Sequence, residues 1–220
     1  MMHKNYFIIG DVHGCLNTFK ELVDRYWDKE NEVLIQLGDL IDRGSFSPQT
    51  LYFSEGLEKQ NPEKVKILRG NHEQMALDYY DDISTSWLAN GGRETLFQFE
   101  AADREIKNIL PWIRNRKLYI ETEHMYISHA GLSLKIKDTE DPRHPDGLLW
   151  NRGPLKNLGK VQIIGHTPLN TGKPSYSSES NSWNIDTGAY KGICLSGIKL
   201  NNQGKFLDYF SIPTHNEDLL

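Results

Sequence analysis

The sequence of 220 residues predicts an α/β fold that opens with parallel β-α units. Three apolar runs of strand length, at 6–9, 33–37 and 65–68, each end in glycine or Arg-Gly before a polar residue. Segments with apolar residues at helical spacing follow these runs, near 16–27, 50–60 and 73–80. Alternating strands and helices predict a parallel sheet with crossover helices, and ligands collect at the carboxyl ends of such strands.

The rest of the sequence predicts a mainly helical stretch and then more strands. We expect helices at 74–80, 93–99 and 102–113, with a helix breaker at Asn90-Gly91-Gly92. Strand-like runs lie at 117–122, 124–128, 161–164, 182–185, 193–199 and 206–212. We expect a loop at 133–148, a hairpin turn at 201–204 and a frayed tail at 214–220. No domain boundary stands out, so we expect one domain, 1–220, with a helical insertion at approximately 74–116.

Composition limits the classes of function. The net charge is −5, whereas a general nucleic-acid binder needs an excess of lysine and arginine. No apolar stretch reaches the roughly 18 residues of a membrane helix, and the N-terminus has no cleavage-like small-residue site. We therefore expect a cytoplasmic protein without a membrane or nucleic-acid partner. The two cysteines, Cys15 and Cys194, indicate no disulfide framework, and the sequence leaves the oligomeric state open.

Six candidate metal ligands share one setting, in which a strand-like run precedes them and a glycine or small residue lies close by. They are Asp11, His13, Asp39, Asn71, His129 and His166. Taken singly, such residues are also common as helix caps or as hydrogen-bonded core histidines. At the ends of five predicted strands they together indicate a metal site. The mixture of imidazole and oxygen ligands favours manganese, iron or zinc, and one carboxylate can bridge two ions.

Five motifs occur in the order and approximate spacing of the PPP family of metallophosphoesterases. They are GDVHG (10–14), GDLIDRG (38–44), GNHE (70–73), HAG (129–131) and GHTP (165–168). DTGAYKG (186–192) resembles the closing segment of bacterial members. The sequence is thus similar to the bacterial serine/threonine protein phosphatases of this family and to the related symmetrical diadenosine tetraphosphatases. The resemblance implies a calcineurin-like metallophosphoesterase fold, with two mixed β-sheets in a sandwich flanked by helices.

The resemblance also implies how two divalent ions would be held, with manganese favoured and iron or zinc as alternatives. Asp39 would bridge both ions, and Asp11 and His13 would complete the first site. The second site would add Asn71, His129 and His166.

Four further residues match the family's catalytic positions. By resemblance, His72 is the general acid that protonates the leaving alkoxide, and Asp42 holds and polarises its imidazole. Histidine suits this task because it exchanges a proton near neutral pH. Arg43 and Arg152 would bind the substrate phosphate, while a hydroxide activated by the two metals attacks in line.

The complete Asp42-Arg43 pair favours a serine/threonine protein phosphatase that acts on a phosphorylated protein or peptide. Relatives that split diadenosine tetraphosphate symmetrically more often have alanine before this arginine. The alternative is therefore a hydrolase of dinucleoside polyphosphates or other small phosphoesters, and a remote alternative is a non-catalytic scaffold. The sequence also departs from its relatives, because Ser45 stands where they usually place proline directly after Asp-Arg-Gly.

Some neighbouring residues have two interpretations. Glu73 is expected to stabilise a helix N-terminus and not to act in the chemistry. Asp186 suits either a partner for a ligand histidine or a turn. Trp87 would line a substrate groove or fill the core of the helical segment. Cys15 is expected to pack in a first helical turn, with a redox-sensitive thiol as the alternative.

Overall fold

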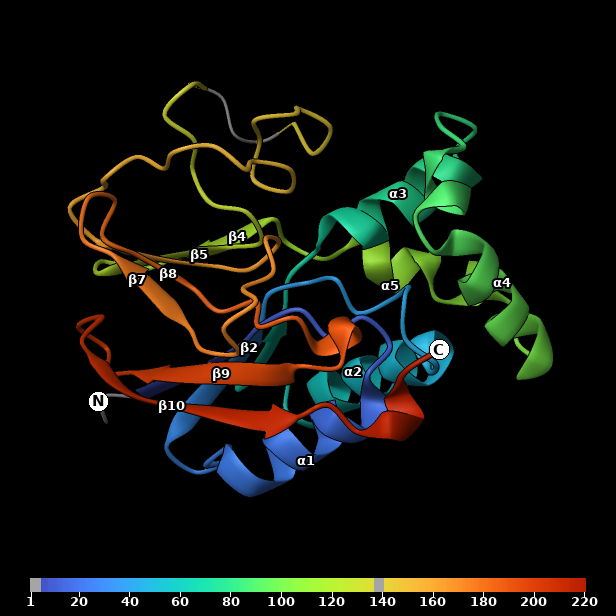
Figure 1. Ribbon diagram of the computed structural model, residues 1–220, viewed down its shortest axis with the longest axis horizontal. Coiled ribbons are helices and arrows are strands. Elements are labelled where there is room, and N and C mark those ends of the chain that lie inside the picture. The colour runs from blue at the N-terminus through green and yellow to red at the C-terminus, as the bar shows by residue number, and fades with distance from the viewer. Residues whose placement is uncertain (1–4, 137–140) are drawn as a thin grey trace.

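The computed structural model describes residues 5–136 and 141–220, and these form an α/β fold with two mixed sheets (Figure 1). The first sheet has the order β10-β9-β1-β2-β3 and the second the order β4-β5-β6-β8-β7. The first sheet contains β1 (Asn5–Ile9), β2 (Glu32–Gln36), β3 (Val65–Ile67), β9 (Cys194–Leu200) and β10 (Phe206–Pro213). The second contains β4 (Tyr119–Glu121), β5 (Met125–Ser128), β6 (Val161–Ile164), β7 (Ser175–Ser177) and β8 (Ser182–Asn184).

The parallel β-α beginning predicted from the sequence is confirmed. Strand β2 pairs in parallel with β1 on one side and with β3 on the other. Helices α1 (Leu16–Tyr26) and α2 (Ser47–Gln60) make the two crossovers, and α3 (Asn71–Tyr80) follows β3. Because all three strands run the same way, the motifs after them meet at one edge of the sheet.

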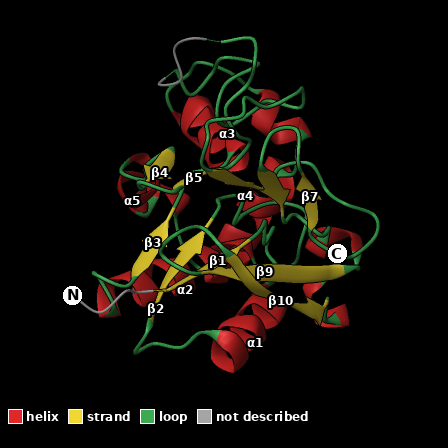
Figure 2. Ribbon diagram, turned by 90° about the vertical axis from the view of Figure 1, so that its left-hand side faces the viewer, coloured by secondary structure: helices red, strands yellow, loops and turns green. Residues whose placement is uncertain are grey.

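The two sheets pack face to face, as the family resemblance implied. Ile8 and Ile35 of the first sheet share a buried apolar cluster with Ile127 and Ile163 of the second. On its other face the first sheet packs against helices, where α1 contributes buried side chains such as Phe19. Figures 1 and 2 both show α1 on the side of this sheet that faces away from the second sheet.

The predicted helical insertion at 74–116, which connects β3 to β4 along the chain, differs from its prediction at 102–113. Helix α4 (Gly92–Ala101) lies where 93–99 was predicted, but the single helix expected at 102–113 is wrong. The chain turns at Asp103, where φ is +50°, and then forms a short 3-10 helix (Ile106–Asn108) and α5 (Leu110–Arg114). Pro111 suits the first turn of α5, where no intrahelical N–H bond is lost. A further 3-10 helix, Ser86–Ala89, precedes α4.

The predicted frayed tail is also wrong, because the C-terminal residues dock against the start of α1. The Asp218 carboxylate accepts hydrogen bonds from the backbone N–H groups of Asn17 and Thr18, at 3.0 and 2.8 Å. These are orphan donors of α1, whose own N-cap residue makes no side-chain hydrogen bond. The N–H of Ser45 donates to the Asp218 carbonyl over 2.9 Å. A proline at position 45 would lack this donor, so the departure from the family pattern accompanies the docked tail.

Other expectations concern the remaining strands, loops and cysteines. The predicted strands after 117 are confirmed as β4, β5, β6, β8, β9 and β10, whereas the exposed strand β7 was not predicted. Positions 137–140 of the expected loop at 133–148 lie outside the described residues. Cys15 and Cys194 are buried free thiols. Within the described parts of the chain, no helix is long and apolar enough to cross a membrane.

Candidate metal centre

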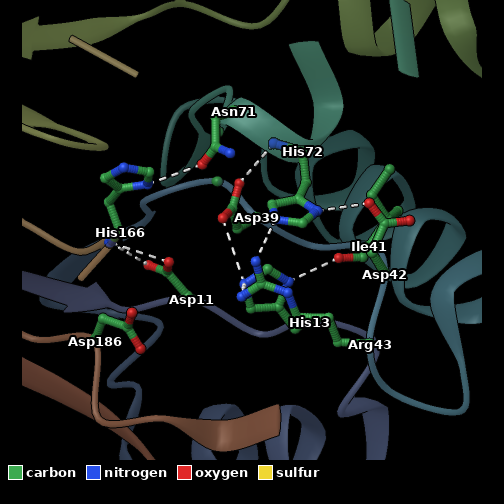
Figure 3. A network of polar contacts seen from close by, with 12 residues as sticks. Asp11, His13, Asp39, Ile41, Asp42, Arg43, Asn71, His72, His166 and Asp186 are labelled. Atoms are coloured by element: carbon green, nitrogen blue, oxygen red, sulfur yellow. Dashed lines mark hydrogen bonds and ion pairs between the residues drawn. The ribbon is translucent and has the colours of Figure 1, made fainter. Parts of the chain in front are cut away.

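The predicted ligands gather where strands of both sheets end. Asp11, Asp39 and Asn71 follow β1, β2 and β3, whereas His129 and His166 follow β5 and β6. Figure 3 shows Asp11, Asp39, Asn71 and His166 around one centre. Two sets of three buried side chains have candidate ligand atoms within 4.8 Å of one another. These sets are His13, Asp39 and His72, and Asp39, His129 and His166.

Left-handed backbone conformations direct several of these side chains inward. The φ angle is +48° at His13, +54° at Asp39 and +69° at His166. Residues other than glycine rarely adopt such angles, so the surrounding structure must hold them. The carbonyl of Asp39 accepts hydrogen bonds from the N–H groups of Val12 and His13, at 3.0 and 2.8 Å. The first two motifs are therefore joined through their backbones.

Glu73 connects the GNHE motif (70–73) to the GDLIDRG motif (38–44). Its carboxylate accepts hydrogen bonds from the N–H groups of Asp39, Leu40 and Gly70, at 2.8, 2.7 and 2.8 Å. Gly70 precedes α3, so the contact stabilises the N-terminus of that helix, as the sequence predicted. The same carboxylate ties this helix to the loop after β2.

The hydrogen bonds of two histidines leave their second ring nitrogens facing oxygen. Nδ1 of His13 donates to the Ile41 carbonyl over 2.8 Å, and Nδ1 of His129 donates to the Leu37 carbonyl over 3.0 Å. A carbonyl only accepts, so in each neutral ring Nε2 holds a lone pair. Both Nε2 atoms lie 3.4 Å from Oδ2 of Asp39. Lone pairs and a carboxylate oxygen at this range repel one another unless a cation or proton lies between them.

Asn71 and His166 extend the same arrangement. The Asn71 Oδ1 atom is 2.9 Å from both Nε2 of His129 and Nδ1 of His166, and these two nitrogens are 3.2 Å apart. Among the described residues, Nε2 of His166 has no hydrogen-bond partner despite its burial. Imidazole nitrogens, an amide oxygen and carboxylates directed at one centre form a donor set that fits divalent transition metals. The residues present therefore fit the metal ions that the sequence predicted.

Burial and neighbouring charges move the pKa values of these groups in opposite directions. Burial raises the pKa of Asp11 well above its ordinary value. Burial would also raise the pKa of Asp39, but the imidazoles around it, above all His129, hold it well below its ordinary value. Burial lowers the pKa of His166 to about 2. Burial opposes charge on His129 too, but Asp39 and Asp11 raise its pKa to about 9. Such crowded buried charges are a setting that bound cations stabilise.

A second group of contacts surrounds His72. Its Nδ1 lies 2.6 Å from Oδ2 of Asp42, and both side chains are buried (Figure 3). Its backbone N–H donates to Oδ1 of Asp39 over 3.0 Å. The Asp42 carboxylate also accepts hydrogen bonds from the indole of Trp87 and the hydroxyl of Thr95. The predicted pair is therefore brought together, and it adjoins the candidate metal ligands.

The two predicted phosphate-binding arginines lie on different sides of the site. Arg43 directs its guanidinium at Nε2 of His72, 2.9 Å away, and at Nε2 of His13, 3.3 Å away. It also lies over the ring of Tyr190, 4.4 Å from the centroid. Arg152 is exposed and donates to the carbonyl of His166 and to the hydroxyl of Thr167, at 3.4 and 3.2 Å. Arg43 is thus inside the cluster, while Arg152 is at its rim.

Asp186 and Cys15 have roles that the geometry helps to distinguish. Oδ1 of Asp186 accepts from the N–H of Gly188 over 3.0 Å, which is a turn contact. Asp186 is also a neighbour of Asp11 (Figure 3), and its negative charge contributes to the raised pKa there. Burial raises the pKa of the Cys15 thiol to about 12, so the thiolate that redox chemistry requires is scarce near neutral pH. Cys15 is packed in the core, as expected.

Sequence reasoning missed Tyr190 and Thr95, and it left two roles open for Trp87. Trp87 belongs to the apolar core, yet its N–H reaches Asp42. Thr95 lies on α4 among residues of helical spacing, with nothing local to mark it. Tyr190 lies in DTGAYKG, the segment that resembles bacterial relatives, and this was the available signal.

Comparisons with known proteins agree with the fold and with a phosphoesterase. A family model described as calcineurin-like phosphoesterase matches residues 5–199. Serine/threonine-protein phosphatase 1 of Salmonella typhimurium is 33% identical over 203 residues, covering 86% of this chain and 88% of that protein. The asymmetrical bis(5'-nucleosyl)-tetraphosphatase PrpE of Anoxybacillus flavithermus is 29% identical over 228 residues, covering 88% and 89%. A solved protein serine/threonine phosphatase from Saccharomyces cerevisiae has a TM-score of 0.66 at 14% identity, covering 98% of this chain and 82% of that one, and it supports the fold alone.

Proposed function

Since this chain belongs to the calcineurin-like phosphoesterase family, we propose that it is a metal-dependent phosphatase that removes phosphate from serine or threonine side chains of proteins. Its similarity to a bacterial serine/threonine-protein phosphatase over most of both chains supports this substrate class. The structural observation that carries the proposal is the His72–Asp42 contact of 2.6 Å.

The leaving group explains why this contact favours a phosphorylated alcohol. Phosphoserine and phosphothreonine release a strongly basic alkoxide, which leaves readily only when an acid protonates it. A dinucleoside polyphosphate releases a nucleotide phosphate, which is already a stable anion. A histidine held by a buried carboxylate is therefore most useful to an enzyme with an alcohol leaving group. Asp42 orients the ring through Nδ1, so that Nε2 is the atom that gives the proton.

The proposed metal ligands are those around Asp39. Asp11, His13 and Asp39 would hold one divalent ion, and a second would share Asp39. The second would also use Asn71, His129 and His166. Two such ions supply Lewis acidity, which activates water and offsets charge on the phosphate. The mixed imidazole and oxygen donors favour manganese, with iron or zinc as alternatives.

Arg43 and Arg152 are the proposed phosphate-binding residues. The planar guanidinium of Arg43 has paired donors that match two phosphate oxygens. The guanidinium now contacts Nε2 of His72, at 2.9 Å. A neutral imidazole nitrogen is a weaker acceptor for this guanidinium than an anionic phosphate oxygen. Phosphate would draw Arg43 toward itself and free Nε2 of His72 to hold the transferable proton. Arg152, at the rim beside His166, would contact the phosphate from the other side.

A second candidate function is hydrolysis of dinucleoside polyphosphates. The similarity to an asymmetrical bis(5'-nucleosyl)-tetraphosphatase covers as much of the chain as the similarity to the protein phosphatase. The same metal ligands and arginines would serve that reaction. Asp42 is the residue on which the two candidates differ, because only the alcohol leaving group depends on the acid.

A comparison of substrates tests the proposal. The rates on a panel of phosphoserine and phosphothreonine peptides and on diadenosine tetraphosphate are measured side by side in Mn²⁺. We expect the phosphopeptides to react faster, and Asp42→Ala to lower their rate while sparing the tetraphosphate. A faster tetraphosphate reaction that is indifferent to Asp42→Ala supports the second candidate instead. No hydrolysis of either substrate or of p-nitrophenyl phosphate would contradict both and favour a non-catalytic scaffold.

A further inference from the structure

We infer that Trp87 and Thr95 are positioning residues for the proton transfer, and that they act through the carboxylate of Asp42. The inference rests on the proposed function, in which His72 protonates the leaving alkoxide. Both residues come from the helical insertion predicted at approximately 74–116. Their hydrogen bonds make this segment part of the catalytic apparatus.

The Asp42 carboxylate is fully buried and accepts hydrogen bonds from three side chains. Nε1 of Trp87 lies 2.9 Å from Oδ2 and 3.2 Å from Oδ1. Oγ1 of Thr95 lies 2.5 Å from Oδ1, and Nδ1 of His72 lies 2.6 Å from Oδ2. A buried carboxylate is costly unless such donors satisfy it. The two residues from the insertion thus satisfy the Asp42 carboxylate in its buried position behind the histidine.

The placement of the donors also fixes the direction of the carboxylate. Thr95 donates to Oδ1, and the Trp87 indole N–H lies between the two oxygens, so the carboxylate cannot rotate without losing both contacts. Oδ2 therefore stays directed at His72. With Nδ1 held there, Nε2 faces the side of Arg43, where the phosphate is proposed to bind. Proton transfer requires this alignment, because its rate depends on the geometry between the acid and the leaving oxygen.

The chain between Trp87 and Thr95 approaches Asp42 too closely for ordinary side chains. A Cβ at Gly91 would lie 2.6 Å from Cβ of Asp42, and φ there is +109°. A Cβ at Gly92 would lie 2.5 Å from the Trp87 ring. The two glycines after Asn90, predicted only as a helix breaker, therefore also allow the insertion to seat its donors on Asp42.

Removal of each donor with little change of volume provides the test. In Trp87→Phe and Thr95→Val, kcat and KM are measured on a phosphoserine peptide and on 2,4-dinitrophenyl phosphate. The dinitrophenolate leaves without a proton, so its release does not need the acid. We expect kcat on the phosphopeptide to fall about tenfold at unchanged KM, and kcat on dinitrophenyl phosphate to stay nearly the same. Equal losses on both substrates, or no loss on either, would overturn the inference.

Two matched variants separate this role from general packing. Thr95→Ser keeps the hydroxyl and should restore the phosphopeptide rate that Thr95→Val loses. Trp112→Phe removes another indole hydrogen bond of the insertion, the one to Glu58 at 3.0 Å, and should leave the ratio of the two rates unchanged. A Thr95→Ser variant as impaired as Thr95→Val, or a Trp112→Phe variant with the same substrate dependence as Trp87→Phe, would contradict positioning through Asp42.

His72→Asn distinguishes failure of this inference from failure of the proposed function. If His72→Asn loses the phosphopeptide rate selectively and Trp87→Phe does not, the acid role stands and the inference is overturned. If His72→Asn affects both substrates equally, the acid role fails and the inference with it. We expect the Trp87→Phe substitution to lower the rate no further when His72→Asn is already present.

A spectroscopic test needs no activity assay. In metal-free protein, Asp42→Asn should shift the indole N–H resonance of Trp87 and not that of Trp112. An unmoved Trp87 resonance would contradict the contact between Trp87 and Asp42.

Discussion

Two aspartates of one loop, Asp39 and Asp42, have the same burial and opposite surroundings. Both are buried and both have left-handed backbones, with φ of +54° and +70°. Oδ2 of Asp39 faces Nε2 of His13 and Nε2 of His129, the ring nitrogens that offer a lone pair to a cation when these rings are neutral. The oxygens of Asp42 instead face N–H and O–H donors.

The difference separates the site into two halves with different requirements. The half around Asp39 collects acceptors, and only a cation satisfies many acceptors at once. The half around Asp42 is complete with protein donors alone. Loss of metal should therefore disturb the first half and spare the second, and loss of the acid should do the reverse. The following predictions test this separation, beginning with the largest effect.

Replacement of the acid should have the largest effect on turnover. His72→Asn keeps a polar side chain at the start of α3 but cannot protonate the leaving alkoxide. We expect phosphopeptide turnover to fall by roughly 10²- to 10⁴-fold, with the metal content nearly intact. Steady-state kinetics and metal analysis of the same preparation check both parts. Loss of both metals from this variant would place His72 in the metal half and contradict the separation.

Metal binding should stabilise the folded protein, since the acceptors around Asp39 converge only in the native state. Mn²⁺ at about 100 times its Kd should raise the free energy of unfolding by about 2.7 kcal/mol for each site that it fills. Denaturant unfolding of metal-stripped protein with and without Mn²⁺ measures the change. Asp42→Asn should show the same increase, and Asp39→Asn much less. An equal increase in these two variants would mean that the halves are not distinct.

In metal-free protein, Asp186 should make the free energy of unfolding depend on pH. Burial raises its pKa from 3.8 to about 6, so the folded state binds this proton more tightly than the unfolded state. The contribution to stability is complete below pH 3.8 and is lost as the pH rises through about 6. Relative to Asp186→Asn, the wild type should lose about 2 kcal/mol between pH 4 and pH 6. Parallel stability curves for the two proteins in metal-free buffer would contradict this.

Replacement of Asp218, which lies outside both halves of the site, should have a smaller effect on the free energy of unfolding. It resembles Asp42 in that donors of Asn17 and Thr18 satisfy both of its oxygens. Asp218→Asn should lower the free energy of unfolding by about 1 kcal/mol, because it weakens the cap of α1. Metal content should not change. Asp208→Asn, at an exposed position of β10, is the matched control and should be nearly neutral. A loss of metal in Asp218→Asn would mean that the docked tail shapes the site.

The half around Asp39 could be predicted from the sequence, and most of the support for Asp42 could not. Asp11, Asp39 and Asn71 each follow an apolar run and a glycine, and this local pattern fixes them at the ends of neighbouring strands. Trp87 and Thr95 have no such mark, because their partner Asp42 is 45 and 53 residues away in the sequence. The helical spacing around Thr95 and the aromatic side chain of Trp87 indicate burial, but they do not say which polar group these residues contact.

The C-terminal tail was mispredicted for a similar reason. A short polar segment at a chain end usually lacks enough buried contacts to stay ordered. Here Asp218 finds its donors about 200 residues away, at the start of α1. Ser45 was the one local indication, since it departs from the family's proline and supplies an N–H to Asp218. The meaning of this departure becomes apparent only when the two segments lie side by side.

The most direct test of the separation is the number of metal ions bound by Asp39→Asn and by Asp42→Asn. Mn²⁺ is titrated calorimetrically into each metal-stripped variant and into the wild type. We predict two ions per chain for the wild type and for Asp42→Asn, and impairment of both sites at once in Asp39→Asn, whose bridging carboxylate is gone. Two fully occupied sites in Asp39→Asn, or loss of both in Asp42→Asn, would contradict the assignment of these aspartates to different halves of the site.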